Sequence, residues 1–420
     1  MKKSICLLVL ALLSSSFVLG QTKYKMVIKT NGGAKYDFKT DEIRNITFEA
    51  YEDDNNGDDN GGTTSPFTNG ALIINNGSVS SGIDGSLTFL DLSTNPAGVQ
   101  QNVYKTANGM SLGGTPNDVI VHGDKIYIAG CDENTVFVLN KKTFKQITRI
   151  STTDALGTAE GINPRHLIGY ADKVYVTTYG GYVAVVDTTS LSITNKYKVG
   201  SAPEGMTLGG SETELYLYVA NSDYGMGNGS ISIINLKDGS ITEFKNEMIH
   251  NPQEVAVAWN SLNNSSDIYV LDWGTYNEDW TQQLNAGVYR ISGNTVTKVV
   301  PDATGMATYG YTIITYNYPW GAKEPTFSYY NINYNQLSSI KFVGGNPIQS
   351  PSAIAIDPNT GYIFIATRDM DPDTGYPSYT TPGYVNIYDP AFNFYGTTSY
   401  ATGVEPHAIA FSYEVKIVNN

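Results

Sequence analysis

Residues 163–187 read NPRHLIGYADKVYVTTYGGYVAVVD and contain the pattern that decides the fold. A proline precedes a short apolar run, and two further runs rich in Val and Tyr follow it after short polar turns. Short alternating runs of β-branched and aromatic residues, separated by Gly, Asp and Asn, are typical of β-strands. The stretch therefore predicts three consecutive antiparallel strands joined by tight turns.

The proline-led strand recurs along the chain. It reads TPNDVIV (115–121), NPRHLIG (163–169), APEGMTL (202–208), NPQEVAV (251–257), SPSAIAI (350–356) and EPHAIAF (405–411). The prolines lie 39 to 55 residues apart, except for one gap of 99 that we interpret as a skipped repeat near Pro301. Four strands in a unit of this length are typical of a β-propeller blade, and the count is seven.

The two ends of the repeat region complement each other. Residues 405–411 supply a first strand only, whereas residues 71–77 and 86–91 supply a second and a third strand. Joined, they form one blade and leave no open sheet edge between the first and last blades. We therefore predict an all-β, seven-bladed β-propeller with four-stranded blades, closed by N- and C-terminal strands and preceded by a small N-terminal β segment.

The chain divides into four predicted parts. Residues 1–20 have two early lysines and a short apolar run, as in a secretory signal peptide. Residues 21–50 indicate a short β-hairpin segment with a turn at Asn31, and residues 51–68 form an acidic linker rich in Gly, Asn and Asp. Residues 69–420 contain the propeller.

Composition excludes several partners. The formal net charge of -14 disfavours nucleic acid and anionic membranes, and no apolar run is long enough to span a bilayer. Because residues 1–20 resemble a signal peptide, we expect an exported protein of the cell surface, periplasm or medium. Gln21 stands at the expected cleavage point, where a surface lipoprotein has Cys, and this weakens the assignment to the cell surface. After cleavage Cys131 is the single cysteine, so no intrachain disulfide is expected.

One face of the propeller is predicted to carry the function. The loop before the first strand of a blade and the loop between its second and third strands lie on this face, and the latter is expanded in four consecutive blades. Those loops carry Tyr224, Trp273, Tyr276, Trp280, Tyr318, Trp320, Tyr376 and Tyr379. The residues after the repeat prolines should ring the channel mouth: Asn117, Arg165, Glu204, Gln253, Ser352 and His407. We predict a ligand-binding surface; the alternative is that the rings only pack on one another and seal the rim.

Catalytic and metal sites are weakly indicated. No nucleophile elbow, phosphate loop or dinucleotide fingerprint is present, and we predict no catalytic residue, no cofactor and no metal. His166, Glu204 and His407, on different blades, would be the residues of a lyase or lactonase, or of a metal site. Asp369, Asp371 and Asp373 alternate as in calcium loops, but the Gly and the final Glu are misplaced.

The repeats resemble a known group of propellers. The motif P-x-x-(I/V)-A, followed by IY(V/I) and V-x-V-(V/I)-(D/N) runs, is similar to YncE-like and YVTN-type propellers over residues 69–420. The leader TDEIRNITFE (40–49) and the acidic linker look like the N-terminal segments of exported Bacteroidetes proteins. Some propellers of that phylum are BtuG-type corrinoid-capture proteins, which sit over a TonB-dependent transporter and pass it cobalamin-like ligands.

Three functions follow as hypotheses. The first is an exported, non-enzymatic binding propeller that captures a corrinoid or similar nutrient for TonB-dependent uptake, as the resemblance implies. The second is a scaffold whose loops dock another protein of the cell envelope. The third is a propeller lyase or lactonase.

Overall fold

The computed structural model describes residues 25–29, 35–39, 62–211, 214–260, 265–278 and 283–419. They belong to two compact units, Met1–Pro66 with Val415–Asn420, and Phe67–Glu414. In the smaller unit, β1 (Lys25–Lys29) pairs antiparallel with β2 (Lys35–Lys39), which confirms the predicted N-terminal β segment. The signal peptide, the Asn31 turn and most of the linker lie outside the described residues.

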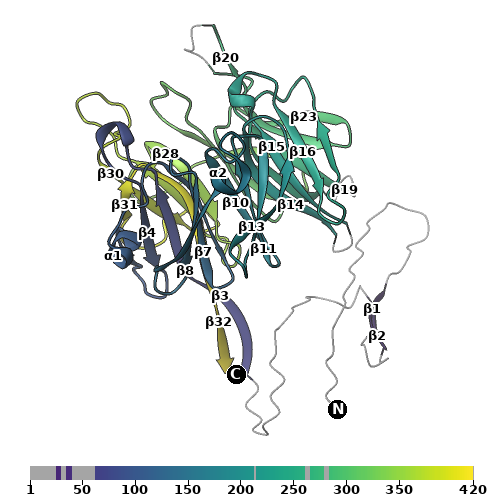
Figure 1. The fold of residues 1–420 in the computed structure, drawn as a ribbon, viewed down its shortest axis with the longest axis horizontal. Helices are drawn as coiled ribbons and strands as arrows, with labels where there is room; N and C mark the ends of the chain where they lie inside the picture. The colour runs from purple at the N-terminus through teal and green to yellow at the C-terminus, as the bar shows by residue number, and fades with distance from the viewer. Residues whose placement is uncertain are drawn as a thin grey trace. The chain divides into compact units, whose positions relative to one another are not determined.

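The larger unit is a seven-bladed β-propeller in which each blade is a four-stranded antiparallel sheet, as predicted (Figure 1). The first four sheets after the closing blade contain β6 (Pro116–His122), β7 (Lys125–Gly130), β8 (Thr135–Asn140) and β9 (Gln146–Ser151); β10 (Pro164–Tyr170), β11 (Lys173–Thr178), β12 (Tyr182–Asp187) and β13 (Ser192–Lys198); β14 (Pro203–Ser211), β15 (Glu214–Asn221), β16 (Ser230–Asn235) and β17 (Ile241–Phe244); and β18 (Pro252–Asn260), β19 (Ser265–Asp272), β22 (Gly287–Ser292) and β23 (Thr295–Pro301).

Two more blades follow, and the closing blade completes the ring. They contain β24 (Gly305–Tyr309), β25 (Thr312–Asn317), β26 (Thr326–Asn331) and β27 (Gln336–Ile340); β28 (Ser350–Ile356), β29 (Ile363–Arg368), β30 (Pro382–Tyr388) and β31 (Tyr400–Val404); and β32 (Pro406–Asn419), β3 (Gly62–Asn75), β4 (Ser86–Asp91) and β5 (Gly98–Gln100). The closing sheet has the order β32-β3-β4-β5, so both ends of the repeat region share one blade, and Figure 1 shows β32 beside β3. The Asn76 amide donates to the Glu405 carbonyl at 2.9 Å next to this junction.

The core lies between neighbouring blades. One cluster packs Tyr127, Ala129 and Val138 from one blade against Val176 and Ala184 from the next. Because each sheet is covered on both faces, central strands such as β7 are almost entirely buried rather than alternating between core and solvent. The side chains of the Val, Ile and Tyr runs therefore pack against neighbouring blades on both faces of a sheet.

A bulge follows the repeat proline and explains the motif. The register shifts directly after the proline in five blades, at Pro116, Pro164, Pro203, Pro252 and Pro351. A bulge places an extra residue on one strand and re-aims its side chains. In four of these blades both residues after the proline line the central channel, whereas Glu204, after Pro203, does not.

Two details differ from the sequence analysis. Pro301 ends β23, the outer strand of a blade, and the skipped repeat begins instead at Thr304-Gly305 with no bulge. The second detail is that the predicted all-β unit also contains two short helices, α1 (Val103–Asn108) and α2 (Thr152–Leu156). Short 3₁₀ turns, η1 (Val79–Ser81) and η2 (Asp223–Gly225), and a small ladder of β20 (Thr275–Tyr276) with β21 (Gln283–Leu284) lie in the loops.

Candidate functional site

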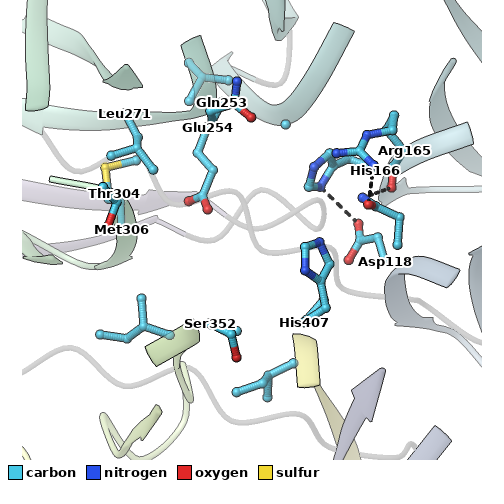
Figure 2. Close-up of a pocket in the computed structure, with 18 of the residues that line it drawn as sticks. Asp118, Arg165, His166, Gln253, Glu254, Leu271, Thr304, Met306, Ser352 and His407 are labelled. Carbon is cyan, nitrogen blue, oxygen red and sulfur yellow. Dashed lines mark hydrogen bonds and ion pairs between the residues drawn. The ribbon is translucent and has the colours of Figure 1, made fainter. Parts of the chain in front are cut away.

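Two cavities meet at the centre of the propeller. The channel cavity has a volume of about 320 Å³ and is lined by residues of the innermost strands (Figure 2). The loop cavity has a volume of about 330 Å³ and is lined mainly by the expanded loops. They share five residues, so one continuous space leads from the loop-bearing face into the channel: Trp273, Thr304, Tyr316, Ser352 and His407.

The channel cavity is built in layers by the bulged strands. The two residues after each repeat proline supply most of its polar groups, among them Asn117, Asp118, Arg165, His166, Gln253, Glu254, Ser352 and His407. In five of the innermost strands the next position is apolar and lines the same cavity: Leu167, Met206, Val255, Ile354 and Ile409. The channel is therefore polar towards the loop-bearing face and apolar below it.

Arg165 is held by a complete set of partners. Its Nε donates to Glu204 Oε2 at 2.9 Å, its Nη1 donates to Asn117 Oδ1 at 2.5 Å, and the guanidinium lies over the Tyr179 ring at 4.7 Å. Tyr179 Oη also donates to Glu204 Oε1 at 2.5 Å. Such a paired guanidinium stabilises the packing of three blades and has little capacity left for a ligand.

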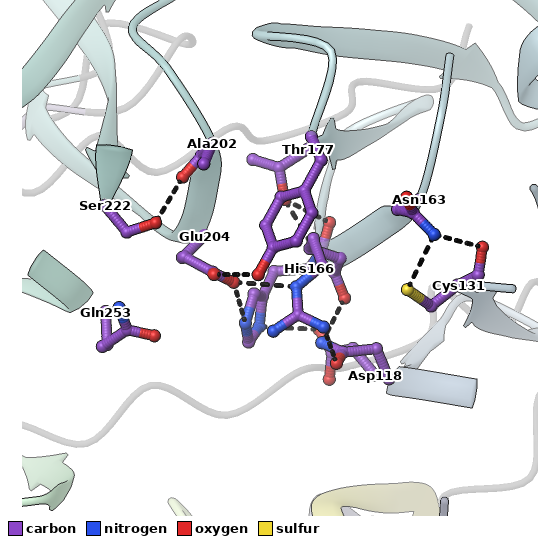
Figure 3. A network of polar contacts seen from close by, with 12 residues as sticks. Asp118, Cys131, Asn163, His166, Thr177, Ala202, Glu204, Ser222 and Gln253 are labelled. Atoms are coloured by element: carbon purple, nitrogen blue, oxygen red, sulfur yellow. Dashed lines mark hydrogen bonds and ion pairs between the residues drawn. The ribbon is translucent and has the colours of Figure 1, made fainter. Parts of the chain in front are cut away.

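His166 belongs to the same network (Figure 3). Its Nδ1 lies 3.6 Å from Asp118 Oδ2 and its Nε2 lies 3.6 Å from Glu204 Oε2. Burial lowers the pKa of His166, but the hydrogen bond and charge of Asp118 and the charge of Glu204 outweigh it and raise the pKa above its usual value. The imidazole is thereby biased towards the charged form.

Glu254 and His407 face the channel cavity differently. Figure 2 shows both side chains pointing into the open space, Glu254 from β18 and His407 from β32. Neither side chain makes a hydrogen bond to any described residue. Burial raises the pKa of Glu254 to about 7, and burial together with the charges of Arg165, His166 and Arg368 lowers the pKa of His407 to about 3.

Aromatic rings form the wall of the loop cavity. Trp320 stacks on Tyr376 with ring centres 6.2 Å apart and planes 12° apart, although Trp320 is 70% exposed and Tyr376 56% exposed. Trp273 is anchored by its Nε1, which donates to the Thr304 carbonyl at 2.9 Å. Tyr276, Tyr318 and Tyr379 complete the ring set. Large flat side chains thus remain accessible from solvent on this face.

A guanidinium with weak contacts lies in the same wall. Arg368 Nη1 is 3.5 Å from Glu405 Oε1 and 3.4 Å from Tyr379 Oη, and its Nε is buried without a hydrogen-bond partner among the described residues. The nearby Asn76 Oδ1 is likewise buried without one. Burial raises the pKa of Glu405, and the charge of Arg368 opposes that rise. The long contacts of Arg368 Nη1 leave this guanidinium with donor capacity at the cavity wall.

The structure brings most of the predicted site residues together. Seven of them line the loop cavity, namely Trp273, Tyr276, Tyr318, Trp320, Tyr376, Tyr379 and His407, and Asn117, Arg165 and Gln253 line the channel cavity. Glu204 is instead buried behind Arg165, and Tyr224 packs on Tyr179 with ring centres 5.1 Å apart, away from both cavities. Trp280 lies outside the described residues.

Sequence reasoning identified His166 but missed two other residues that lie two places after a repeat proline. Asp118 and Glu254 were not predicted, because strict alternation in a strand would direct them into the sheet interior. The bulge changes that direction, and the repeated proline is the signal that would have indicated it. Arg368 was missed because it ends a second strand, outside the motif.

The metal alternatives find no converging ligands. Within the described ranges, no group of three or more His, Cys, Asp or Glu side chains is arranged to hold a metal ion. In the loop with alternating aspartates, the Asp371 carboxylate accepts from the Asp373 amide at 2.9 Å and thus stabilises its own turn. No helix in the described part of the chain is long and apolar enough to cross a membrane.

Comparisons with known proteins place this geometry in context. Residues 69–251 match the family described as a domain of unknown function, DUF5074. No curated protein matches the sequence. Among solved structures, a quinoprotein alcohol dehydrogenase-like protein of Bacteroides thetaiotaomicron is similar at 13% identity and a TM-score of 0.52, over 92% of this chain and 84% of that one. Kuenenia stuttgartiensis hydrazine synthase is similar at 17% identity and a TM-score of 0.50, over 65% and 76%. At these identities the likeness concerns the fold alone, and this fold also occurs in enzymes.

Proposed function

We propose that this protein is an exported binding propeller that captures a small molecule with broad apolar faces and hydrogen-bonding edges, without a catalytic step. A corrinoid or a similar nutrient has this character, and a TonB-dependent transporter would receive it. The observation that supports the proposal is the continuous space formed by the two cavities, with accessible rings at its mouth and polar groups below.

The aromatic wall suits a flat ligand. Exposed rings such as Trp320 and Tyr376 lose water-accessible apolar surface when a flat molecule covers them, and this burial favours binding. Burial of an anchoring Trp commonly contributes about 2 kcal/mol or more to an interface. The loop cavity has the volume of a small-ligand site, and its open side leaves room for a larger ligand to project outward.

The polar groups suit a ligand with amide or similar edges. Arg368 lines the loop cavity, and its Nη1 donates only long hydrogen bonds, to Tyr379 Oη at 3.4 Å and to Glu405 Oε1 at 3.5 Å. A ligand that carries amide oxygens can accept a hydrogen bond from this guanidinium.

Titration calorimetry with cyanocobalamin and with dicyanocobinamide tests the proposal. We expect binding at micromolar or lower concentration, and Trp320→Ala should raise Kd about 30-fold, the equivalent of about 2 kcal/mol. Trp259→Ala is the matched control, because Trp259 is an exposed Trp (44%) near the turn between β18 and β19 on the opposite face. Absence of heat with both ligands contradicts the corrinoid proposal, and equal losses in the two variants contradict the site.

A second candidate function, a lyase or lactonase, is favoured by one observation. Glu254, with its pKa of about 7, lies in the same cavity as His166, and such a pair suits proton transfer near neutral pH. The predicted trio of His166, Glu204 and His407 is replaced in this reading by His166 and Glu254, because Glu204 is occupied by Arg165. Turnover of a lactone or uronate substrate that is lost in Glu254→Gln would support it.

A further inference from the structure

His407 lies where the two cavities join. It is the residue after the repeat proline in β32, and it lines both the channel cavity and the loop cavity. Figure 2 shows its imidazole pointing into the open space rather than into the blade. A molecule in the loop cavity therefore meets this ring at the cavity floor, where the channel begins.

The imidazole of His407 differs from the other three histidine rings. His122 Nε2 lies 2.8 Å from the Ala171 carbonyl oxygen, and His166 lies between two carboxylates. His250 has one buried ring nitrogen that has no hydrogen-bond partner among the residues described, but it lines neither cavity. His407 makes no hydrogen bond or ion pair with any described residue and is the histidine that is shared by both cavities.

The surroundings of His407 keep its nitrogen lone pair available. Burial and the charges of Arg165, His166 and Arg368 lower its pKa to about 3, so the ring is neutral at physiological pH. A neutral imidazole is a strong ligand for cobalt, iron, copper and zinc. In structural roles a histidine usually has at least one ring nitrogen hydrogen-bonded, and the lack of such a bond here leaves both nitrogens available.

We propose that His407 donates a ring nitrogen to the metal of a flat, metal-centred macrocycle that binds in the loop cavity. The proposal rests on the proposed function and names the group that recognises the ligand's centre. The rings of Trp273, Trp320 and Tyr376 contact the periphery of the macrocycle, and one axial face of its metal is directed to the cavity floor. Water leaves the metal and the imidazole lone pair takes its place, with no change in oxidation state.

This arrangement accounts for features that simple aromatic packing leaves unexplained. The metal would be coordinated from the channel side, while the polar corner at Arg368 and Asn76 would contact the edge of the ring. Selection would then depend on an exchangeable axial position as well as on shape. A macrocycle whose axial positions are blocked by tightly bound ligands would bind more weakly than one that carries water.

Visible spectroscopy of the purified protein with diaquocobinamide tests the proposal, because both axial positions of this probe carry exchangeable water. We expect the absorption bands of the bound probe to shift to those of cobinamide mixed with free imidazole. His407→Ala should abolish the shift, and His122→Ala, the matched control at a histidine that lines neither cavity, should retain it. Circular dichroism and thermal unfolding of each variant show whether it is folded, and the wild-type spectrum is informative without any variant.

The outcomes separate this inference from the proposed function. Calorimetric binding by the wild-type protein with no band shift overturns the axial role of His407 and leaves capture of the ligand standing. A shift that persists in folded His407→Ala also overturns it, and a shift that disappears in folded His122→Ala shows that its loss is not specific to His407 and overturns the assignment. Absence of both heat and shift overturns the proposed function together with the inference.

Discussion

Replacement of Glu254 by Gln should stabilise the protein at pH 8 relative to wild type and have much less effect at pH 4. The Glu254 carboxyl faces the channel cavity with no hydrogen-bond partner in the described part of the chain, and burial raises its pKa from an ordinary 4.5 to about 7. A glutamine of the same size stays neutral at every pH. The comparison therefore isolates the free energy of ionising this one group.

The sign follows from proton linkage. Because the folded-state pKa is raised, the contribution of Glu254 to stability is fully present below pH 4.5 and is lost as the pH rises through about 7. Each pH unit in this interval corresponds to about 1.4 kcal/mol, so the loss approaches about 3 kcal/mol by pH 8. Water in the channel would screen the charge, and this makes about 3 kcal/mol an upper value.

Thermal unfolding measured at pH 4 and pH 8 provides the assay. An unfolding entropy of about 2.1 cal/mol/K per residue over roughly 350 residues converts about 3 kcal/mol into about 4 °C. The melting temperature of Glu254→Gln relative to wild type should thus be about 4 °C higher at pH 8 than at pH 4. The control is Glu324→Gln, an exposed acid in the loop between β25 and β26. If both variants differ from wild type equally at the two pH values, the carboxyl is solvated like a surface group and the reasoning is wrong.

Three further predictions concern the blades around the site. Glu204→Gln should lower the unfolding free energy by about 3 kcal/mol, because it leaves the Arg165 charge buried without its counterion. Denaturant titration measures this loss, and an effect under about 0.5 kcal/mol would show that the pair is solvated. Gly305→Ala places a Cβ 2.1 Å from Tyr316 Cε1, so it should destabilise the protein by about 1–3 kcal/mol and alter ligand affinity through the displaced ring; unchanged melting and Kd would contradict this. Deletion of residues 405–420 opens the ring, and limited proteolysis should then cleave the closing blade much faster than in the full chain, whereas equal cleavage rates would show that β32 is dispensable.

Much of the fold could be predicted from the sequence because its signals are local. A proline and three alternating runs recur in each unit, and the incomplete units at the two ends indicate how the ring closes. The exception was the blade that starts at Gly305, where no proline or bulge occurs. The Tyr316 ring packs against the space above this glycine, so the local constraint differs and the motif is absent.

The site was predicted less completely because its chemistry depends on contacts between blades. Arg165 and Glu204 both follow repeat prolines, and nothing local indicates that they neutralise each other. Glu254 was missed because its direction depends on a register shift rather than on alternation. Tyr224 has the same loop position as the other aromatic residues, yet its hydroxyl reaches the Tyr179 carbonyl at 3.2 Å and the ring packs there instead. An aromatic residue on an expanded loop therefore predicts that the ring is exposed, but not which way the ring points.

Under the proposed function, the strand β32 links ligand binding to closure of the ring. It closes the last sheet, and it carries His407 at the junction of the cavities. A molecule in which β32 is detached from this sheet has neither the closed ring nor the floor of the loop cavity. A ligand would consequently bind only molecules with a closed ring, and a bound ligand that contacts His407 would in turn hold this strand in place and slow the opening of the ring.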